Sequence, residues 1–110
     1  MDMLNIELKQ AIIKVLQDIE YIGNYLETQC QLVIDETGNH YLLIEIGWQN
    51  SRRIYGTLIH LDIIKKIWIQ QDGTEEGIAN ELVNLGISQN QIVLAFKTLE
   101  RRKITDFAVY

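Results

Sequence analysis

Apolar residues recur at alternating intervals of four and three near the start of the chain, with charged and amide side chains between them. This spacing places the apolar side chains on one face of a helix, so the pattern predicts a helix over about residues 4–27. The positions on the apolar face are Leu8, Ile12, Val15, Ile19, Ile22 and Leu26, and those on the polar face are Glu7, Lys9, Lys14, Gln17 and Glu20.

Three further apolar residues, Ile6, Ile13 and Leu16, widen the apolar stripe of this helix. Two interpretations account for the extra width. The helix covers its own sheet over a broad area, or it also packs against a second copy of the chain and forms a homodimer.

Two alternating segments follow, over residues 31–35 and 41–48, and they predict a pair of strands. Between them lie Thr37, Gly38 and Asn39, which are typical of a tight hairpin turn because glycine and asparagine tolerate positive φ. In the second strand one face would carry Leu42, Ile44, Ile46 and Trp48, and the other Tyr41, Leu43 and Glu45.

Two more strands are predicted, a third over residues 52–61 and a fourth centred on Trp68, joined through residues 62–66. All the connections are short. Parallel pairing needs a long crossover, so we expect the four strands to form an antiparallel meander.

After the fourth strand, Asp72 and Gly73 predict a turn, and a helix should begin at Thr74. Thr74 can cap its first amides, Asp72 with Glu75 can form a second cap, and Glu75 and Glu76 suit the positive end of the helix dipole. The apolar face of this helix would be Ile78, Ala79, Leu82, Val83 and Leu85, ending at Gly86.

The last part of the chain is ambiguous between helix and strand. Ser88 and Gln91 form a capping-box pattern that predicts a third helix through Leu99, whereas residues 92–96 would also make a short strand.

The predicted fold class is α+β, with a four-stranded antiparallel meander sheet, a long N-terminal helix and one or two shorter C-terminal helices. A length of 110 residues with 47% hydrophobic residues predicts one domain over residues 1–110.

Charge and cysteine content narrow the classes of function. The net charge of -5, from 10 Lys+Arg and 15 Asp+Glu, does not favour autonomous binding along a phosphate backbone. The one cysteine, Cys30, excludes an internal disulfide and a cysteine-cluster zinc site, which fits a reducing compartment. With no membrane-length apolar run and a polar N-terminus, we expect a cytoplasmic protein.

Catalytic or metal chemistry receives little support from sequence motifs. His60 and Asp62 lie two apart, so on a strand they share a face and could share a metal ion or a proton, or make an ordinary structural hydrogen bond. His40 and Cys30 have no ligand partners nearby in sequence, and the acidic residues after Trp68 are explained by capping. Nucleophile-elbow, phosphate-loop and zincin motifs are absent from the sequence. We expect a protein that is not an enzyme, with no cofactor and no bound metal.

Positive charge is concentrated in two clusters, and these are the candidate partner-binding residues. Arginine beside exposed aromatic residues is typical of interfaces with an acidic protein or with phosphates, although solvated charges at strand ends would look the same. The candidate residues are Trp48, Arg52, Arg53 and Tyr55 in the first cluster and Arg101 and Arg102, followed by Lys103, in the second.

Several segments together resemble the XisI family, the fdxN element excision controlling factor proteins of cyanobacteria. The segments are GWQNSRRIYGTLIHLDI, KIWIQQDGTEEGIANELVNLGI, IVLAF and the closing FAVY. The resemblance runs from about Cys30 to the C-terminus, and the leading helix matches only in pattern. After Phe96 the family pattern has a histidine and a proline-containing turn, where this chain has Lys97-Thr98-Leu99-Glu100.

The resemblance implies an accessory factor for a site-specific DNA rearrangement during heterocyst development. Such proteins work beside a recombinase and a partner called XisH, whose family resembles nucleases, so the implied role is regulation and no catalytic residue is carried over. The motif residues become candidates for fold or partner recognition: Trp48, Arg52, Arg53, Tyr55, His60, Asp62, Trp68, Gln70, Asp72, Gly73, Thr74, Glu75, Glu76 and Gly77.

Three hypotheses of function follow. The first is a regulatory subunit that binds an XisH-like protein and contacts the recombinase and DNA only indirectly. The second is direct DNA binding through residues 101–103, which predicts an affinity that falls with salt. The third is a small metal-dependent enzyme that uses His60, Asp62 and the Asp72/Glu75 turn.

Overall fold

The computed structural model describes residues 3–23, 28–75 and 77–110. The first helix, α1, spans Met3–Gly23 and carries the predicted 4/3 spacing. The predicted continuation of this helix to residue 27, with Leu26, lies outside the described residues, and so do the side chain of Ile6 and the residue Glu76.

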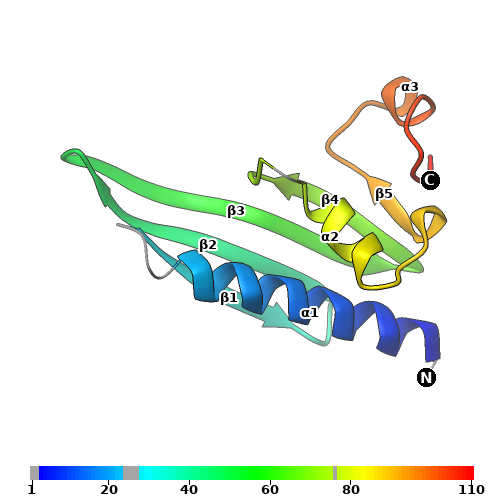
Figure 1. Ribbon diagram of the computed structural model, residues 1–110, viewed down its shortest axis with the longest axis horizontal. Helices are drawn as coiled ribbons and strands as arrows, with labels where there is room; N and C mark the ends of the chain where they lie inside the picture. Colours follow the sequence, from blue (N-terminus) through cyan, green and yellow to red (C-terminus); the bar gives the residue numbers. More distant parts are fainter. Residues whose placement is uncertain (1–2, 24–27, 76) are drawn as a thin grey trace.

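Four strands form the predicted antiparallel meander, and short turns join them (Figure 1). They are β1 (Thr28–Asp35), β2 (His40–Gln49), β3 (Arg52–Ile64) and β4 (Lys66–Asp72). Turn chemistry explains the connections. Asn39, Asn50 and Ser51 have φ values of 57°, 52° and 66°, a left-handed conformation that asparagine tolerates better than most residues.

A fifth strand, β5 (Ile92–Leu94), pairs parallel with β4, so the sheet is mixed and has the order β1-β2-β3-β4-β5. The predicted four-strand antiparallel meander is confirmed, and β5 adds a parallel pair that the prediction did not include. Residues 73–91 supply the crossover, which contains the helix α2 (Ile78–Asn84) and a short 3-10 turn (Gln89–Gln91). The last helix, α3 (Leu99–Arg102), is a single turn.

The start of α2 differs from the prediction based on Thr74. The helix begins at Ile78, after Gly77 with φ 86°, and Thr74 and Glu75 lie in the loop before it. Asp72 caps the start of α2 instead. Its carboxylate accepts hydrogen bonds from the backbone N–H groups of Thr74 at 2.9 Å and Ile78 at 2.8 Å. A residue at the end of β4 thus satisfies the first amide of α2 from outside the helix.

The third predicted helix, which a capping box at Ser88 and Gln91 would begin, does not form. Ser88 makes no side-chain cap, and the chain continues as the strand β5. All three residues of β5 are buried. Burial of consecutive residues favours a strand paired in parallel with β4 over a helix with one solvent-exposed face.

The hydrophobic core lies on one side of the sheet, under α1 and α2 (Figure 1). Tyr41 and Leu43 point from β2 into this core, and Ile59, Leu61 and Ile63 point into it from β3. The helices contribute Leu8, Ile12, Val15, Leu16, Ile78, Ala79 and Leu82. In a strand the alternate residues face the other way, so the even-numbered positions of β2 lie on the sheet face that α1 and α2 do not cover.

Both edges of the sheet are partly satisfied by other segments. At β1, the Leu32 N–H donates a 2.8 Å hydrogen bond to the carboxylate of Glu20 on α1. At β5, Ala108 forms a parallel bridge with Val93, and its N–H donates to the Ile92 carbonyl at 2.8 Å. These contacts reduce the number of main-chain groups that are open to pairing with another chain.

Among the described helices, none combines the length and apolar character needed to cross a bilayer.

Candidate functional site

The uncovered face of the sheet carries a row of side chains from neighbouring strands. The strand register pairs Asp35 with His40, His40 with Asp62, and Asp62 with Trp68. Residues paired across antiparallel strands project from the same face. Residues from four consecutive strands are therefore aligned across this face.

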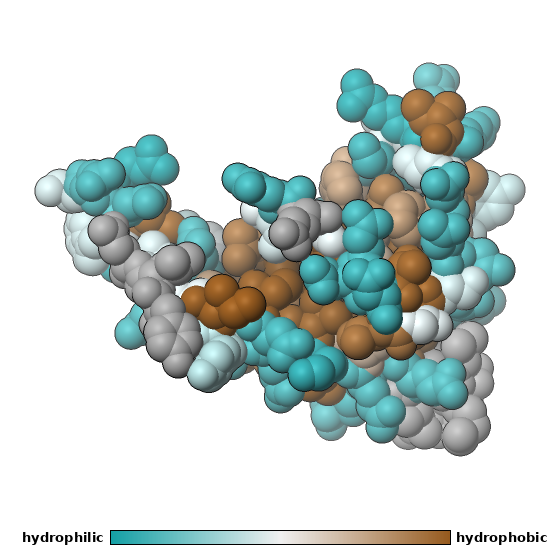
Figure 2. All heavy atoms as spheres, viewed as in Figure 1, coloured by the Kyte–Doolittle hydropathy of each residue, from teal (hydrophilic) through white to brown (hydrophobic). Residues whose placement is uncertain are grey.

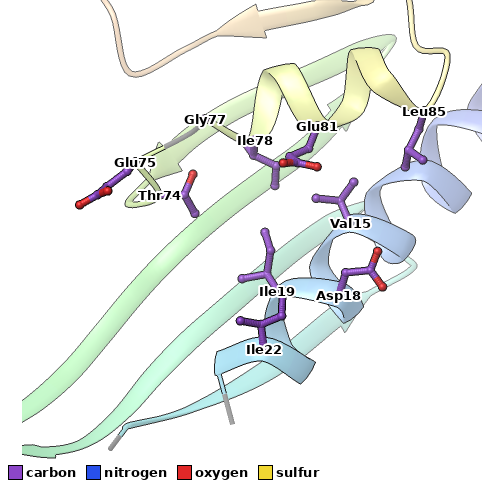
Figure 3. A pocket seen from close by; sticks show the side chains of 10 residues that line it. All are labelled: Val15, Asp18, Ile19, Ile22, Thr74, Glu75, Gly77, Ile78, Glu81 and Leu85. Carbon is purple, nitrogen blue, oxygen red and sulfur yellow. The ribbon is translucent and has the colours of Figure 1, made fainter. Parts of the chain in front are cut away.

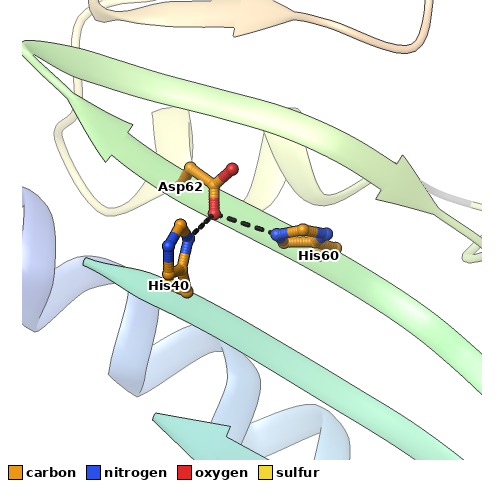
Figure 4. Close-up of side chains that lie close together, drawn as sticks. All are labelled: His40, His60 and Asp62. Carbon is orange, nitrogen blue, oxygen red and sulfur yellow. Dashed lines mark hydrogen bonds and ion pairs between the residues drawn. The ribbon is translucent and has the colours of Figure 1, made fainter. Parts of the chain in front are cut away.

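His40 and Asp62 of this row meet His60, which lies two residues before Asp62 on β3 (Figure 4). The Asp62 Oδ1 atom lies 2.6 Å from Nδ1 of His40 and 2.9 Å from Nε2 of His60. Both rings approach the same carboxylate oxygen, and the ring planes are inclined at 72° to each other. The three side chains form one hydrogen-bonded cluster, which we call the His–Asp cluster.

Asp62 is the buried centre of the His–Asp cluster, with 7% of the residue exposed, whereas His40 is exposed and His60 is partly exposed. The amide of Gln70 donates a 3.2 Å hydrogen bond to the second carboxylate oxygen, Oδ2. This leaves Oδ1 for the two imidazole rings and fixes the orientation of the carboxylate.

The cluster shifts two pKa values in opposite directions. Burial alone would raise the pKa of Asp62, but hydrogen bonds from His40 and His60 outweigh burial and hold that pKa below its ordinary value. The hydrogen bond to Asp62 raises the pKa of His40, and this effect outweighs desolvation of the ring. The arrangement can bind a cation or share a proton, since it places two imidazoles on one ionised carboxylate.

The sequence predicted that His60 and Asp62 share a strand face, and the structure confirms it. The sequence pattern did not indicate that His40 belongs with this pair, because His40 lies 22 positions before Asp62. Regular extension of the β2–β3 pairing from the turn at Asn50–Ser51 places His40 opposite Leu61, one residue before Asp62. One extra residue in β3 changes the register near Leu43, so simple counting from the turn would have missed the pair.

The first arginine cluster lies at the tip of the β2–β3 hairpin, on the same uncovered face. Arg53 pairs with Trp48, and its guanidinium carbon lies 5.4 Å from the centre of the Trp48 ring. Trp48 is 59% exposed and Tyr55, two residues further along β3, is 69% exposed. Arg52 is also exposed beside the turn. The structure thus brings Trp48, Arg53 and Tyr55 onto one exposed strip, the hairpin strip.

In the second arginine cluster, one side chain is bonded to the protein backbone and the other two are exposed to solvent. The guanidinium group of Arg102 donates hydrogen bonds to the backbone carbonyls of Ala95, Lys97 and Val109, at 3.0–3.3 Å, and lies 5.9 Å from the ring of Trp68. Arg101 is exposed, as is Lys103. Arg102 therefore holds the C-terminal segment in place, and its neighbours present their charges to solvent.

An apolar groove of about 280 Å³ lies between α1 and α2 on the helix side of the molecule (Figure 3). Apolar residues gather in the same region of the molecular surface (Figure 2). Its apolar lining is Val15, Ile19, Ile22, Ile78 and Leu85, and its acidic lining is Asp18, Glu75 and Glu81. The groove has no local signature in the sequence, because it forms only where two helices from distant parts of the chain meet.

The family model described as XisI protein matches residues 1–109. This chain belongs to the XisI family. The match includes the leading helix, for which the sequence pattern alone gave no family-specific residues. Among the curated proteins, no sequence matches this chain.

Two solved structures of XisI proteins resemble this one. A XisI-like protein from Anabaena variabilis is 34% identical, with 90% of this chain and 99% of that chain covered and a TM-score of 0.68. The fdxN element excision controlling factor XisI from the same organism is 30% identical, with 94% and 96% covered and a TM-score of 0.79. The similarity extends over nearly the whole of both proteins.

Proposed function

We propose that this XisI protein is a regulatory factor in the excision of a DNA element and that it acts by binding a protein partner. The observation that carries the proposal is the family match over residues 1–109, together with the similarity to a protein named as an excision controlling factor. Regulation by binding is also consistent with a sequence that contains no motif for a catalytic nucleophile, a phosphate loop or a zincin site.

The hairpin strip is the surface we assign to the partner. Its two aromatic side chains and the arginine stacked on Trp48 expose flat, amphipathic groups at the end of a long hairpin. Tryptophan, tyrosine and arginine are the residues that most often dominate binding energy in protein interfaces. Arg53 is held against the ring, so less side-chain entropy is lost when a partner binds.

The partner we propose is an XisH-like protein, as the family resemblance implies. The overall charge of -5 supports a protein partner in preference to nucleic acid, because long-range repulsion opposes the approach of a polyanion. DNA and the recombinase would then be contacted through the partner. Catalysis, where it occurs, would belong to the partner.

Co-expression with an XisH-like protein tests this function. Size-exclusion chromatography with light scattering should show a stable complex, and Arg53→Glu and Trp48→Ala should each weaken it. Removal of an interface hot-spot side chain costs about 2 kcal/mol or more, so the dissociation constant should rise by a factor of roughly 30. Lys65→Glu is the matched control, because Lys65 is exposed at the turn between β3 and β4, at the end of β3 away from the hairpin strip. Separate elution at micromolar concentrations would contradict the proposed partner, and a complex unaffected by either variant would contradict the hairpin strip.

Direct DNA binding is the second candidate function, and the exposed cations Arg101, within α3, and Lys103, directly after it, favour it. The expected affinity for duplex DNA falls steeply between low and moderate salt, because each phosphate contact releases counterions. Arg101→Glu combined with Lys103→Glu should abolish this binding. Affinity that does not change with salt would exclude this function.

A further inference from the structure

The His–Asp cluster offers three ligand atoms of the types that transition metals prefer. The nitrogens of His40 and His60 and a carboxylate oxygen of Asp62 all lie within 4.8 Å of one another. They come from two adjacent strands, so the backbone pairing of the sheet sets the distances between them. This differs from a loose group of surface acids, in which each side chain moves independently.

We propose that His40, His60 and Asp62 form a binding site for a divalent transition metal ion of the zinc class. Two imidazoles with one carboxylate match the ligand sets of zinc sites, whereas calcium and magnesium prefer sites made of oxygen atoms. With three protein ligands, one coordination position faces the uncovered side of the sheet, as in zinc sites that accept water or an external ligand. The proposal does not depend on the protein partner.

The surroundings of Asp62 fit the role of a central ligand. Its second oxygen accepts the hydrogen bond from Gln70, an outer contact of the kind that orients metal-binding carboxylates. Because Asp62 is buried, its side chain is confined to one position, while the partly exposed rings leave a path for an ion from solvent. Trp68 is the strand partner of Asp62 on β4.

The distances between the three ligand atoms must change on metal binding. Two ligands at about 2.0–2.1 Å from a tetrahedral zinc ion lie about 3.3 Å apart. The Asp62 oxygen now lies 2.6 Å from His40 and 2.9 Å from His60, which are hydrogen-bond distances. Zinc would take the place of these two hydrogen bonds, with the proton of each neutral ring on its other nitrogen. Each ring nitrogen would move away from the oxygen by less than about 1 Å, and the two ring nitrogens, which now lie within 4.8 Å of each other, would approach to about 3.3 Å. His40 is exposed and has room to move.

Zinc titration of the protein without a histidine tag tests the site. Isothermal titration calorimetry should show one zinc ion bound per chain at micromolar concentrations. His40→Gln and His60→Gln should each weaken binding by about tenfold or more, and Gln70→Ala by about tenfold, since outer contacts typically contribute that much. Asp18→Asn is the control, because that carboxylate lies on α1 and pairs with Lys14.

Nuclear magnetic resonance of the imidazole rings provides a second readout that needs no variant. The chain contains two histidines, so every imidazole nitrogen signal reports on the cluster. One equivalent of zinc should shift the signals of Nδ1 of His40 and Nε2 of His60 together. The proposal would be overturned by the absence of binding at micromolar concentrations. Perturbation of only one ring, or binding that survives both histidine substitutions, would also overturn it.

Discussion

Tyr41 shows how a single residue of this fold carries an energetic cost. Its ring is fully buried in the core, and its hydroxyl has no hydrogen-bond partner within the described residues. Burial raises the pKa of this phenol. A buried hydroxyl without a partner loses its hydration, at a cost of about 1–3 kcal/mol.

Tyr41→Phe is therefore expected to leave stability unchanged or to increase it by about 1 kcal/mol, since the ring stays and the unsatisfied oxygen is removed. Urea unfolding followed by circular dichroism measures the change. Tyr55→Phe is the control, because the Tyr55 side chain is exposed and should change stability by less than about 0.5 kcal/mol. A clear loss of stability in Tyr41→Phe would mean that the hydroxyl is hydrogen-bonded, for example to a buried water molecule.

The contacts of individual site residues were the part of the site that the sequence predicted least completely. His60 and Asp62 could be paired because the two-residue repeat of a strand is local. His40 reaches Asp62 only through cross-strand pairing, and Arg102 turns inward only because three backbone carbonyls converge on it. Such contacts depend on register and on the path of the chain, which a single sequence does not specify.

At the level of elements, the strands and the first helix were predictable because their hydrophobic patterns are local and strong. The ends of the later elements were not. Asp72, Thr74 and Glu75 all suit a helix start, and the choice among them depends on where β4 ends in space. In residues 92–94 every side chain is buried, so the pattern has no polar face that could distinguish a strand from a helix.

The cap at Asp72 gives a prediction at this level. Asp72→Ala should lower the free energy of unfolding by about 1–2 kcal/mol, because the first amide of α2 and the amide of Thr74 lose their acceptor. Glu75→Gln, the other acid that the sequence suggested as a cap, should have almost no effect. Thermal unfolding of both variants distinguishes the two capping schemes, and the opposite order of effects would place the helix start at Thr74.

At the scale of the whole molecule, Arg102 connects the C-terminal segment to the sheet. Its side chain accounts for three hydrogen bonds to backbone carbonyls on both sides of α3 and contacts the ring of Trp68. Hydrogen bonds from a charged donor contribute about 1.5–3 kcal/mol when their loss leaves a buried partner unsatisfied. Arg102 therefore holds the segment that covers the outer edge of β5, together with the backbone hydrogen bond from Ala108 to Ile92 and a 3.0 Å hydrogen bond from Nζ of Lys66 to the Tyr110 carbonyl.

Arg102→Met keeps an apolar stem against Trp68 but removes the donors, and it should lower stability by about 2 kcal/mol. Hydrogen exchange should also speed up at the Ala108 amide, which donates to Ile92. Arg101→Met is the matched control, because the Arg101 side chain is exposed, and it should leave both measurements unchanged. Equal behaviour of the two variants would show that the C-terminal segment is held by other contacts.

The parallel crossover also sets an order of events during synthesis of the chain. The meander can form once Asp72 has left the ribosome, but β5 completes the sheet only after residues 73–91 and Leu94 have followed. At about 5–20 residues per second this delay is on the order of seconds. During that interval β4, with the apolar residues Ile67 and Ile69, is the outer strand of the nascent sheet. The time of greatest exposure to wrong pairing is therefore set by the speed of translation through the crossover.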